Sequence, residues 1–219
     1  MRADADLSLG GQARLVSEFL ERLDLVDVTL ACNDWGGALL LMSEGRDQRI
    51  GRLVLAACET FDNYPPGLPG KTLGILGRLP GGLALAGQLL RVRALRRLPM
   101  TLGWMSKRPI PDQIVDGWLR PVREAAIRRD LRKYVSGVKS ANRALLAASA
   151  GLTDFDRPVL VAWGPEDRVM PIEHGRRLAE MLPHGRLVEI PDTYTLIPED
   201  QPALLAAEIR DFVAEDRPE

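Results

Sequence analysis

The chain has 219 residues, of which 46% are hydrophobic and 27% are charged, and its formal net charge is −1. This balance is typical of a globular protein with one sizeable core and excludes a chain that is mostly disordered. It also argues against nucleic-acid binding, because such a domain is basic overall and carries a recognisable reading motif.

The sequence shows no sign of a membrane span or of export. No apolar stretch reaches the roughly 18 residues that a spanning helix requires, and the opening "MRADADLSLGG" lacks the order of a secretion signal. We therefore expect a cytoplasmic protein. In that reducing environment Cys32 and Cys58 are expected to be buried free thiols.

The first third of the chain alternates between helix and strand patterns. Apolar residues at helical spacing predict a helix of about four turns after Ser8, whose hydroxyl would cap it. The apolar run 27–33 predicts a strand, 35–45 a helix that ends at Gly45, and 52–58 a second strand.

The middle and the end of the chain differ in pattern. Prolines and glycines at 63–70 are expected to end regular structure, and helical spacing dominates after them. Alternating strand and helix patterns resume at Pro158, which predicts an α/β fold with a mostly parallel sheet and crossover helices. We assign residues 1–64 and 151–219 to an α/β core and residues 65–150 to an inserted helical lid.

The charges are unevenly distributed. Residues 91–133 contain twelve Lys and Arg against four Asp and Glu. We interpret this segment as a solvated basic face of the lid; an anion-attracting or membrane-facing role is the alternative.

Asp34 stands where the first strand is predicted to turn into a helix. In "CNDWGG" small residues surround it, as a strained strand-to-helix turn that presents a nucleophile requires, although Cys32 is larger than the usual glycine and predicts a looser turn. The alternative is that Asp34 only caps the helix that follows.

Two later strands also end in polar loops. "PVLVAWGPEDRVMP" carries Asp167, and "RLVEIPDTYTLIPEDQP" carries Thr195. Because the carboxyl ends of parallel strands meet at one edge of a sheet, we expect these two loops and the turn at Asp34 to assemble an active site there.

With these motifs the sequence resembles the α/β-hydrolase superfamily, in particular its haloalkane dehalogenase and epoxide hydrolase-like branch. The resemblance rests on "NDWGG", "GPEDR" and "IPEDQP" and covers residues 8–215. It implies that Asp34 is the nucleophile, that the Trp35 indole N–H helps to hold the departing anion, and that Asp167 is the accessory acid. It also implies a catalytic histidine in the last loop, where this sequence has Thr195.

The missing base leaves four candidates. The only two histidines are His174, near the carboxyl edge of the sheet, and His184, at the opposite edge. Tyr194 is a poor base at neutral pH. Glu59 follows the second predicted strand at the right edge, but we interpret it as a salt-bridge partner in that loop rather than as the base. Unless one of these groups activates water, we expect turnover to be slow or absent.

The family's first strands and its His-Gly loop are also missing. The strand at 27–33 would then be an edge strand with unpaired backbone groups. Either the true start lies upstream, or a partner such as a second copy of the chain covers this edge. We favour the upstream start.

The leading interpretation is a hydrolase that acts on a small, largely apolar haloalkane, epoxide or ester. Trp104, Met105 and Trp118 could line its pocket or could simply pack the lid onto the core. The pattern implies no cofactor, and no His/Cys cluster has metal-ligand spacing. The alternative is a catalytically silent binding or regulatory protein that kept the pocket.

Overall fold

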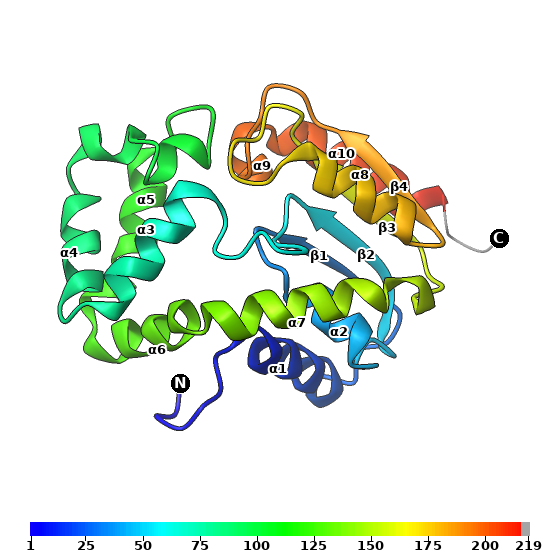
Figure 1. Cartoon of the computed structure of the whole chain (residues 1–219). Coiled ribbons are helices and arrows are strands. Elements are labelled where there is room, and N and C mark those ends of the chain that lie inside the picture. Colours follow the sequence, from blue (N-terminus) through cyan, green and yellow to red (C-terminus); the bar gives the residue numbers. More distant parts are fainter. Residues whose placement is uncertain (216–219) are drawn as a thin grey trace.

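The protein is built around one parallel sheet (Figure 1). The structure, a computed structural model, describes residues 1–215, apart from the side chains of residues 138 and 139. Its strands are β1 (Val28–Asn33), β2 (Ile50–Ala56), β3 (Val159–Trp163) and β4 (Gly185–Glu189), in the spatial order β1-β2-β3-β4 with all pairings parallel. The predicted α/β fold with a mostly parallel sheet is therefore confirmed.

One strand differs from its prediction. β2 begins at Ile50 and ends at Ala56, two residues before the predicted bounds at each end. The chain leaves the extended conformation at Ala57, whose φ is 35°, so Cys58 and Glu59 belong to the loop that follows.

Six helices lie against the strands or follow them directly. They are α1 (Leu9–Arg22), α2 (Gly37–Ser43), α7 (Val138–Ala150), α8 (Ile172–Met181), α9 (Ile197–Asp200) and α10 (Pro202–Glu215). The Ser8 hydroxyl accepts a hydrogen bond from Gly11 N–H at 3.1 Å, so the predicted cap of α1 is present. Gly45 follows α2 with a φ of 63°, a conformation that glycine adopts without steric cost.

The sheet buries both of its faces. Leu53 and Leu55 of β2 belong to the larger core, which α2, α7 and α8 complete, whereas Val54 points to the other face and packs with Leu160 and with Phe212 of α10. Burial of each such side chain stabilises the fold by about 1.5–3 kcal/mol. This burial on both faces explains why the strands are continuous apolar runs.

The segment between β2 and β3 is helical, and we call residues 65–150 the helical insertion. Before α7 it contains α3 (Gly67–Arg78), α4 (Gly82–Leu89), η1 (Arg93–Arg97), η2 (Leu102–Trp104), α5 (Asp112–Leu119), η3 (Pro121–Arg123) and α6 (Ala125–Ser136), and the short η4 (Leu152–Asp154) follows it. Figure 1 shows α3, α4 and α5 together, away from the strands.

Two details of the insertion were not expected. α3 begins at Gly67, inside the stretch 63–70 that was predicted to lack regular structure; Pro69 fits because the first-turn N–H groups of a helix have no intrahelical partner. α7 packs on α2 and buries Leu145 completely in the core. The division into a core and a lid stays a prediction.

The outer edges of the sheet are β1 and β4 within residues 1–215. The same part of the chain contains no helix that is long and apolar enough to cross a membrane.

Candidate active site

Asp34 lies on a sharp turn between β1 and α2. Its φ is 57°, in the left-handed region, and its N–H donates to the Ala57 carbonyl at 3.0 Å. Gly36 is required beside it, because a Cβ there would lie 2.4 Å from the Glu59 carbonyl oxygen. The turn forms with Cys32, which is buried, in place of a smaller residue.

The Asp34 carboxylate does not cap the helix that follows it. The N-terminal cap of α2 is Gly36, without any side-chain cap, so the capping alternative is wrong. Asp34 Oδ1 is buried and has no hydrogen-bond partner among the described residues, and Asp34 lines a cavity. Buried carboxylate oxygens normally have donors, so this one is available to a ligand.

The environment of Asp34 opposes its ionisation. Burial raises the pKa of Asp34 well above its usual value, and the negative charges of Glu59 and Asp167 raise it further. A carboxylate ionised in such a place has little solvation, which makes it reactive toward an electrophile.

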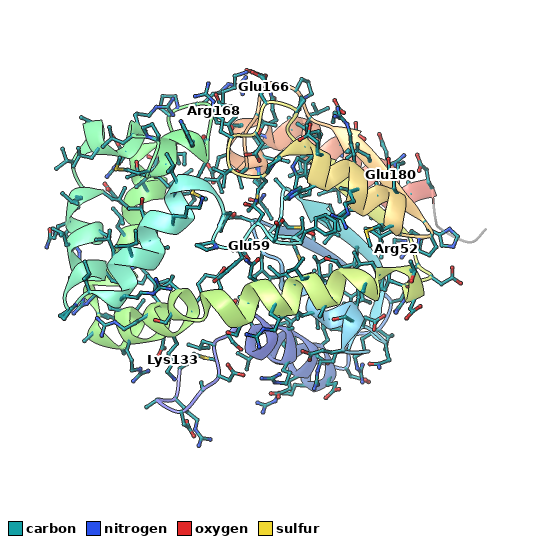
Figure 2. The ribbon with its side chains drawn as sticks, viewed as in Figure 1. Arg52, Glu59, Lys133, Glu166, Arg168 and Glu180 are labelled. Carbon is teal, nitrogen blue, oxygen red and sulfur yellow. The ribbon has the colours of Figure 1, made fainter. Side chains whose placement is uncertain are left out.

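Glu59 lies in the same cavity, 3% exposed (Figure 2). The Gly36 N–H donates to its Oε2 at 3.3 Å, and the Tyr134 hydroxyl donates to its Oε1 at 3.2 Å. Burial raises the pKa of Glu59 to about 7, although these two hydrogen bonds lower it. Glu59 can therefore exchange a proton near neutral pH.

Asp167 and Thr195 lie in contact. Val169 N–H and Met170 N–H donate to Asp167 Oδ1 at 2.8 and 3.0 Å, and the Thr195 hydroxyl lies 2.8 Å from Oδ1 and 3.0 Å from Oδ2. Burial raises the pKa of Asp167 to about 6, against the effect of these hydrogen bonds. The hydroxyl of Thr195 thus occupies the position beside Asp167 at which the resemblance implies an imidazole.

Neither histidine is part of this cavity. His174 lies on α8 with its ring edge-on to Phe61, at 5.4 Å between centroids, and burial lowers its pKa. His184 is exposed, with Nε2 2.8 Å from Asp156 Oδ1, next to the first residue of β3. Among the described residues, Glu59 is the candidate base that shares the cavity with Asp34.

The aromatic candidates are placed differently from one another. Trp35 Nε1 is buried without a partner in the described part of the chain, but Trp35 is not among the residues that line the cavity. Trp104 packs at the edge of the core, whereas Trp118 on α5 is 44% exposed. Tyr194 is buried under the Arg168 guanidinium. The structure does not bring Trp104, Trp118 or Tyr194 to the cavity wall.

The cavity beside Asp34 has a volume of about 130 Å³. Met105, which the sequence suggested either as a pocket residue or as packing between lid and core, lies in its wall, whereas sequence reasoning missed the two tyrosines of the wall. The wall residues are Asp34, Glu59, Tyr64, Pro65, Pro66, Pro69, Gly70, Leu73, Gly74, Met105, Tyr134, Val135 and Val169. Tyr64 and Tyr134 meet edge to face at 6.3 Å, a contact between distant segments that spacing along the chain does not reveal.

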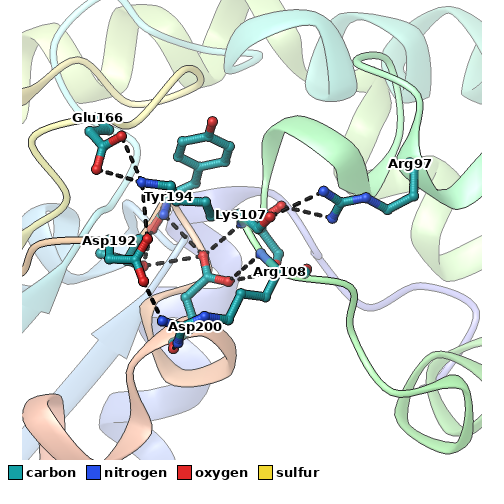
Figure 3. Close-up of polar contacts among 9 residues, drawn as sticks. Arg97, Lys107, Arg108, Glu166, Asp192, Tyr194 and Asp200 are labelled. Atoms are coloured by element: carbon teal, nitrogen blue, oxygen red, sulfur yellow. Dashed lines mark hydrogen bonds and ion pairs between the residues drawn. The ribbon is translucent and has the colours of Figure 1, made fainter.

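A second polar cluster holds the insertion against the loop after β4 (Figure 3). Asp200 Oδ1 accepts hydrogen bonds from Ser106 Oγ and Arg108 N–H, both at 2.9 Å. Asp200 Oδ2 accepts three more, from Lys107 N–H, Tyr194 N–H and Thr193 Oγ1, at 2.8, 3.0 and 3.3 Å. We call Asp200 and these five donors the Asp200 clamp. Next to it, the Met105 carbonyl accepts from Leu196 N–H at 2.8 Å, which fixes the wall of the cavity.

The structure gives no indication of a metal centre. Within residues 1–215, no three His, Cys, Asp or Glu residues lie close enough to hold an ion. At Asp34, two carboxylates, those of Asp34 and Glu59, share a cavity whose wall is otherwise largely apolar.

Comparisons with known proteins agree with this fold. The sequence profile described as "Alpha/beta hydrolase family" matches residues 2–208. The chain is 31% identical over 104 residues to the uncharacterized hydrolase YugF of Bacillus subtilis (strain 168), covering 48% of this chain and 36% of that protein. It is 27% identical over 186 residues to a 2-hydroxy-6-oxo-6-phenylhexa-2,4-dienoate hydrolase of Burkholderia cepacia, covering 82% of this chain and 60% of that protein.

The alignments thus cover 36% and 60% of the length of these two relatives. Among solved structures, the 2-hydroxy-6-oxo-6-phenylhexa-2,4-dienoate hydrolase from Rhodococcus sp. strain RHA1 superposes with a TM-score of 0.74 at 16% identity, over 94% of this chain and 70% of that one. At that identity the likeness shows the fold alone.

Proposed function

The chain belongs to the alpha/beta hydrolase family, and from this premise we propose that it is a hydrolase whose Asp34 carboxylate attacks an electrophilic carbon of a small, largely apolar substrate. One observation carries the proposal. Asp34 Oδ1, on a left-handed turn at the end of β1, is buried without a partner among the described residues, and Asp34 lines a largely apolar cavity. Haloalkanes and epoxides are the substrate classes that suit such a carboxylate.

The first step is a displacement. An Asp34 oxygen forms a bond to the substrate carbon while the carbon–halogen or epoxide carbon–oxygen bond breaks, which leaves an ester on the enzyme. We assign the departing halide to the Trp35 N–H, which has no partner in the described residues; Trp35 does not line the cavity, so its indole has to turn toward it. The alkoxide formed from an epoxide takes the hydroxyl proton of Tyr134, which is protonated beforehand because burial first and the Glu59 charge second raise its pKa; the resulting phenolate recovers a proton from solvent water.

The second step needs a base, and we propose Glu59. Its carboxylate takes a proton from water as the water oxygen adds to the ester carbonyl of Asp34, and it returns that proton to the alcohol that leaves. A pKa of about 7 makes Glu59 partly ionised at neutral pH and therefore able to do both. Its position in the wall that Asp34 also lines supports this role.

One observation favours a second candidate function, that of a silent binding protein. The Thr195 hydroxyl fills the place beside Asp167 and cannot act as a base. A protein that kept the cavity but lost the chemistry would bind the same apolar molecules without converting them.

Intact-mass spectrometry with 1-bromohexane and 1,2-epoxyhexane tests the proposal. We expect wild type to form a covalent adduct and to release alcohol or diol, and Asp34→Asn to do neither, because its side chain cannot attack. Asp167→Asn is the matched control, and it should still form the adduct. Equal turnover by wild type and Asp34→Asn would contradict the proposal. Saturable binding by both without adduct or product would favour the silent protein.

A further inference from the structure

The helical insertion exposes many large apolar side chains. Their exposed fractions lie between 37% and 59%. They are Leu68, Ile75, Leu79, Leu85, Leu89, Val92, Leu98, Met100 and Trp118. Leu85 and Leu89 are four residues apart on α4, so they lie on one face of that helix. Where exposed apolar side chains gather on a surface, they mark a contact with a partner or a membrane.

A second cavity opens through this surface. It has a volume of about 340 Å³ and is enclosed mainly by apolar side chains of α3, α4 and the segment 95–105. Leu89, Leu98 and Met100 line it and are also 37–47% exposed, so they form its rim. We call Leu85, Leu89, Val92, Leu98 and Met100 the insertion rim.

The second cavity also adjoins the cavity of Asp34. Pro69, Leu73 and Met105 line both of them. The two cavities are therefore neighbours, and these three side chains form the wall between them.

The charge of the insertion is strongly positive. Residues 65–150 contain sixteen Lys and Arg and four Asp and Glu, whereas the rest of the chain contains thirteen basic and twenty-six acidic residues. Five arginines line one open hollow of about 390 Å³ beside the rim, together with Asp116 and Leu119. They are Arg91, Arg93, Arg96, Arg120 and Arg123.

One of these arginines is fixed by the fold, while others are free to face a partner. Arg96 is 7% exposed and donates to Asp112 and Asp116 at 2.6 Å each. Arg91, Arg120 and Arg123 are exposed. The hollow therefore has one buried, ion-paired arginine and carries exposed cationic side chains at the surface.

We propose that the insertion rim and its arginines dock on the surface of an anionic lipid bilayer. A bilayer presents both chemistries that this face offers, because headgroup phosphates attract the arginines and acyl chains accept Leu and Met side chains. A nucleic acid would satisfy the charges but not the exposed aliphatic rim. The acidic remainder of the molecule is repelled by the same surface, which orients the insertion toward it.

Docking in this orientation gives the cavity a role. The opening at Leu89, Leu98 and Met100 faces the lipid, so an apolar molecule dissolved in the membrane enters without crossing water. The docking proposal does not depend on the reaction at Asp34, so measurements of lipid binding alone can test it.

Flotation with lipid vesicles at physiological salt tests the proposal. We expect wild type to float with vesicles of phosphatidylcholine mixed with phosphatidylglycerol and to remain behind with phosphatidylcholine alone. The triple variant Arg91→Gln, Arg120→Gln, Arg123→Gln should bind the anionic vesicles on the order of a hundredfold more weakly. The double variant Leu85→Ser, Val92→Ser, whose residues do not line the cavity, should bind about tenfold more weakly.

Matched variants elsewhere on the surface control for general effects. Phe19→Ser with Leu23→Ser removes apolar residues of α1 that are 57% and 55% exposed, and Arg2→Gln, Arg22→Gln, Arg210→Gln removes three exposed charges outside the insertion. Both should bind like wild type. Equal loss in the controls, equal binding to neutral vesicles, or binding to duplex DNA without binding to vesicles would overturn the proposal.

Discussion

Asp200 and Asp34 both lie at the carboxyl edge of the sheet, but their carboxylates have opposite surroundings. Asp200 is 1% exposed and accepts hydrogen bonds from five donors of the Asp200 clamp. Asp34 has a buried oxygen, Oδ1, without a hydrogen-bond partner among the described residues, and its neighbours Glu59 and Asp167 repel its negative charge.

This difference separates a structural carboxylate from a functional one. The donors around Asp200 replace the water that it loses on burial, so its charge stabilises the fold. Asp34 Oδ1 has no donors of this kind among the described residues. The buried carboxylate of Asp34 therefore lowers the stability of the fold. A group that is kept at such a cost is where a ligand is expected to act.

The largest effect that distinguishes the two carboxylates is expected from Asp200→Ala. Removing the acceptor leaves several buried donors without partners, so we expect the free energy of unfolding to fall by about 3–5 kcal/mol. For a domain of this size the melting temperature should fall on the order of 10 °C. Thermal unfolding followed by circular dichroism measures the change.

Two variants serve as controls for Asp200→Ala. Asp192→Ala removes a neighbouring carboxylate that pairs with Lys107 and Arg108 but is 47% exposed, and its effect should be much smaller. Asp34→Asn should leave stability unchanged or raise it, because the folded environment disfavours the charge. A loss in Asp34→Asn as large as that in Asp200→Ala would break the comparison.

Much of the fold could be predicted from the sequence, because it depends on local patterns. The runs 27–33 and 159–163 are short and apolar, and they form β1 and β3 nearly as expected. The errors fall where local signals compete. The prolines near Pro66 suggested irregular structure, but a proline in the first turn of a helix is compatible with α3.

The site was less predictable, because its properties depend on contacts between distant segments. The pattern around Asp34 located the turn, but the raised pKa of Glu59 requires burial in the folded cavity. Tyr134, which donates to Glu59, lies 75 positions further along the chain. The Asp200 clamp likewise joins residues 106–108 to the loop after β4, and no sequence pattern predicts such a pairing.

A smaller effect is expected from the pH dependence of stability in Glu59→Gln. The pKa of Glu59 rises from 4.5 to about 7 on folding, so between these values the unfolded chain releases a proton that the folded protein keeps. The free energy of unfolding therefore falls as pH rises through this window, by about 3 kcal/mol in total. Glutamine does not titrate and should lack this fall.

Urea unfolding at pH 4.5 and pH 8 measures this difference, because the titrating groups that do not interact with Glu59 contribute equally to both proteins. We expect the free energy of unfolding of Glu59→Gln, relative to that of wild type, to be higher at pH 8 than at pH 4.5. Parallel pH profiles for the two proteins would show that Glu59 is not destabilised by burial, and Glu59 would then resemble Asp200 rather than Asp34.

The smallest of the three effects is expected from Thr195→Val, which tests Asp167. The surroundings of Asp167 are intermediate between those of Asp200 and those of Asp34. Asp167 accepts two backbone N–H groups and the Thr195 hydroxyl, and valine keeps the shape of threonine while removing that hydroxyl. Loss of a buried hydrogen bond to a charged group should cost about 2 kcal/mol at pH 8, where Asp167 is ionised. Because the Thr195 bond lowers the pKa of Asp167, its removal should raise that pKa, and the loss of stability should shrink as pH falls. Denaturant unfolding of both proteins across this range checks the expectation, and a loss that does not change with pH would mean that the hydroxyl acts through packing and not through the charge of Asp167.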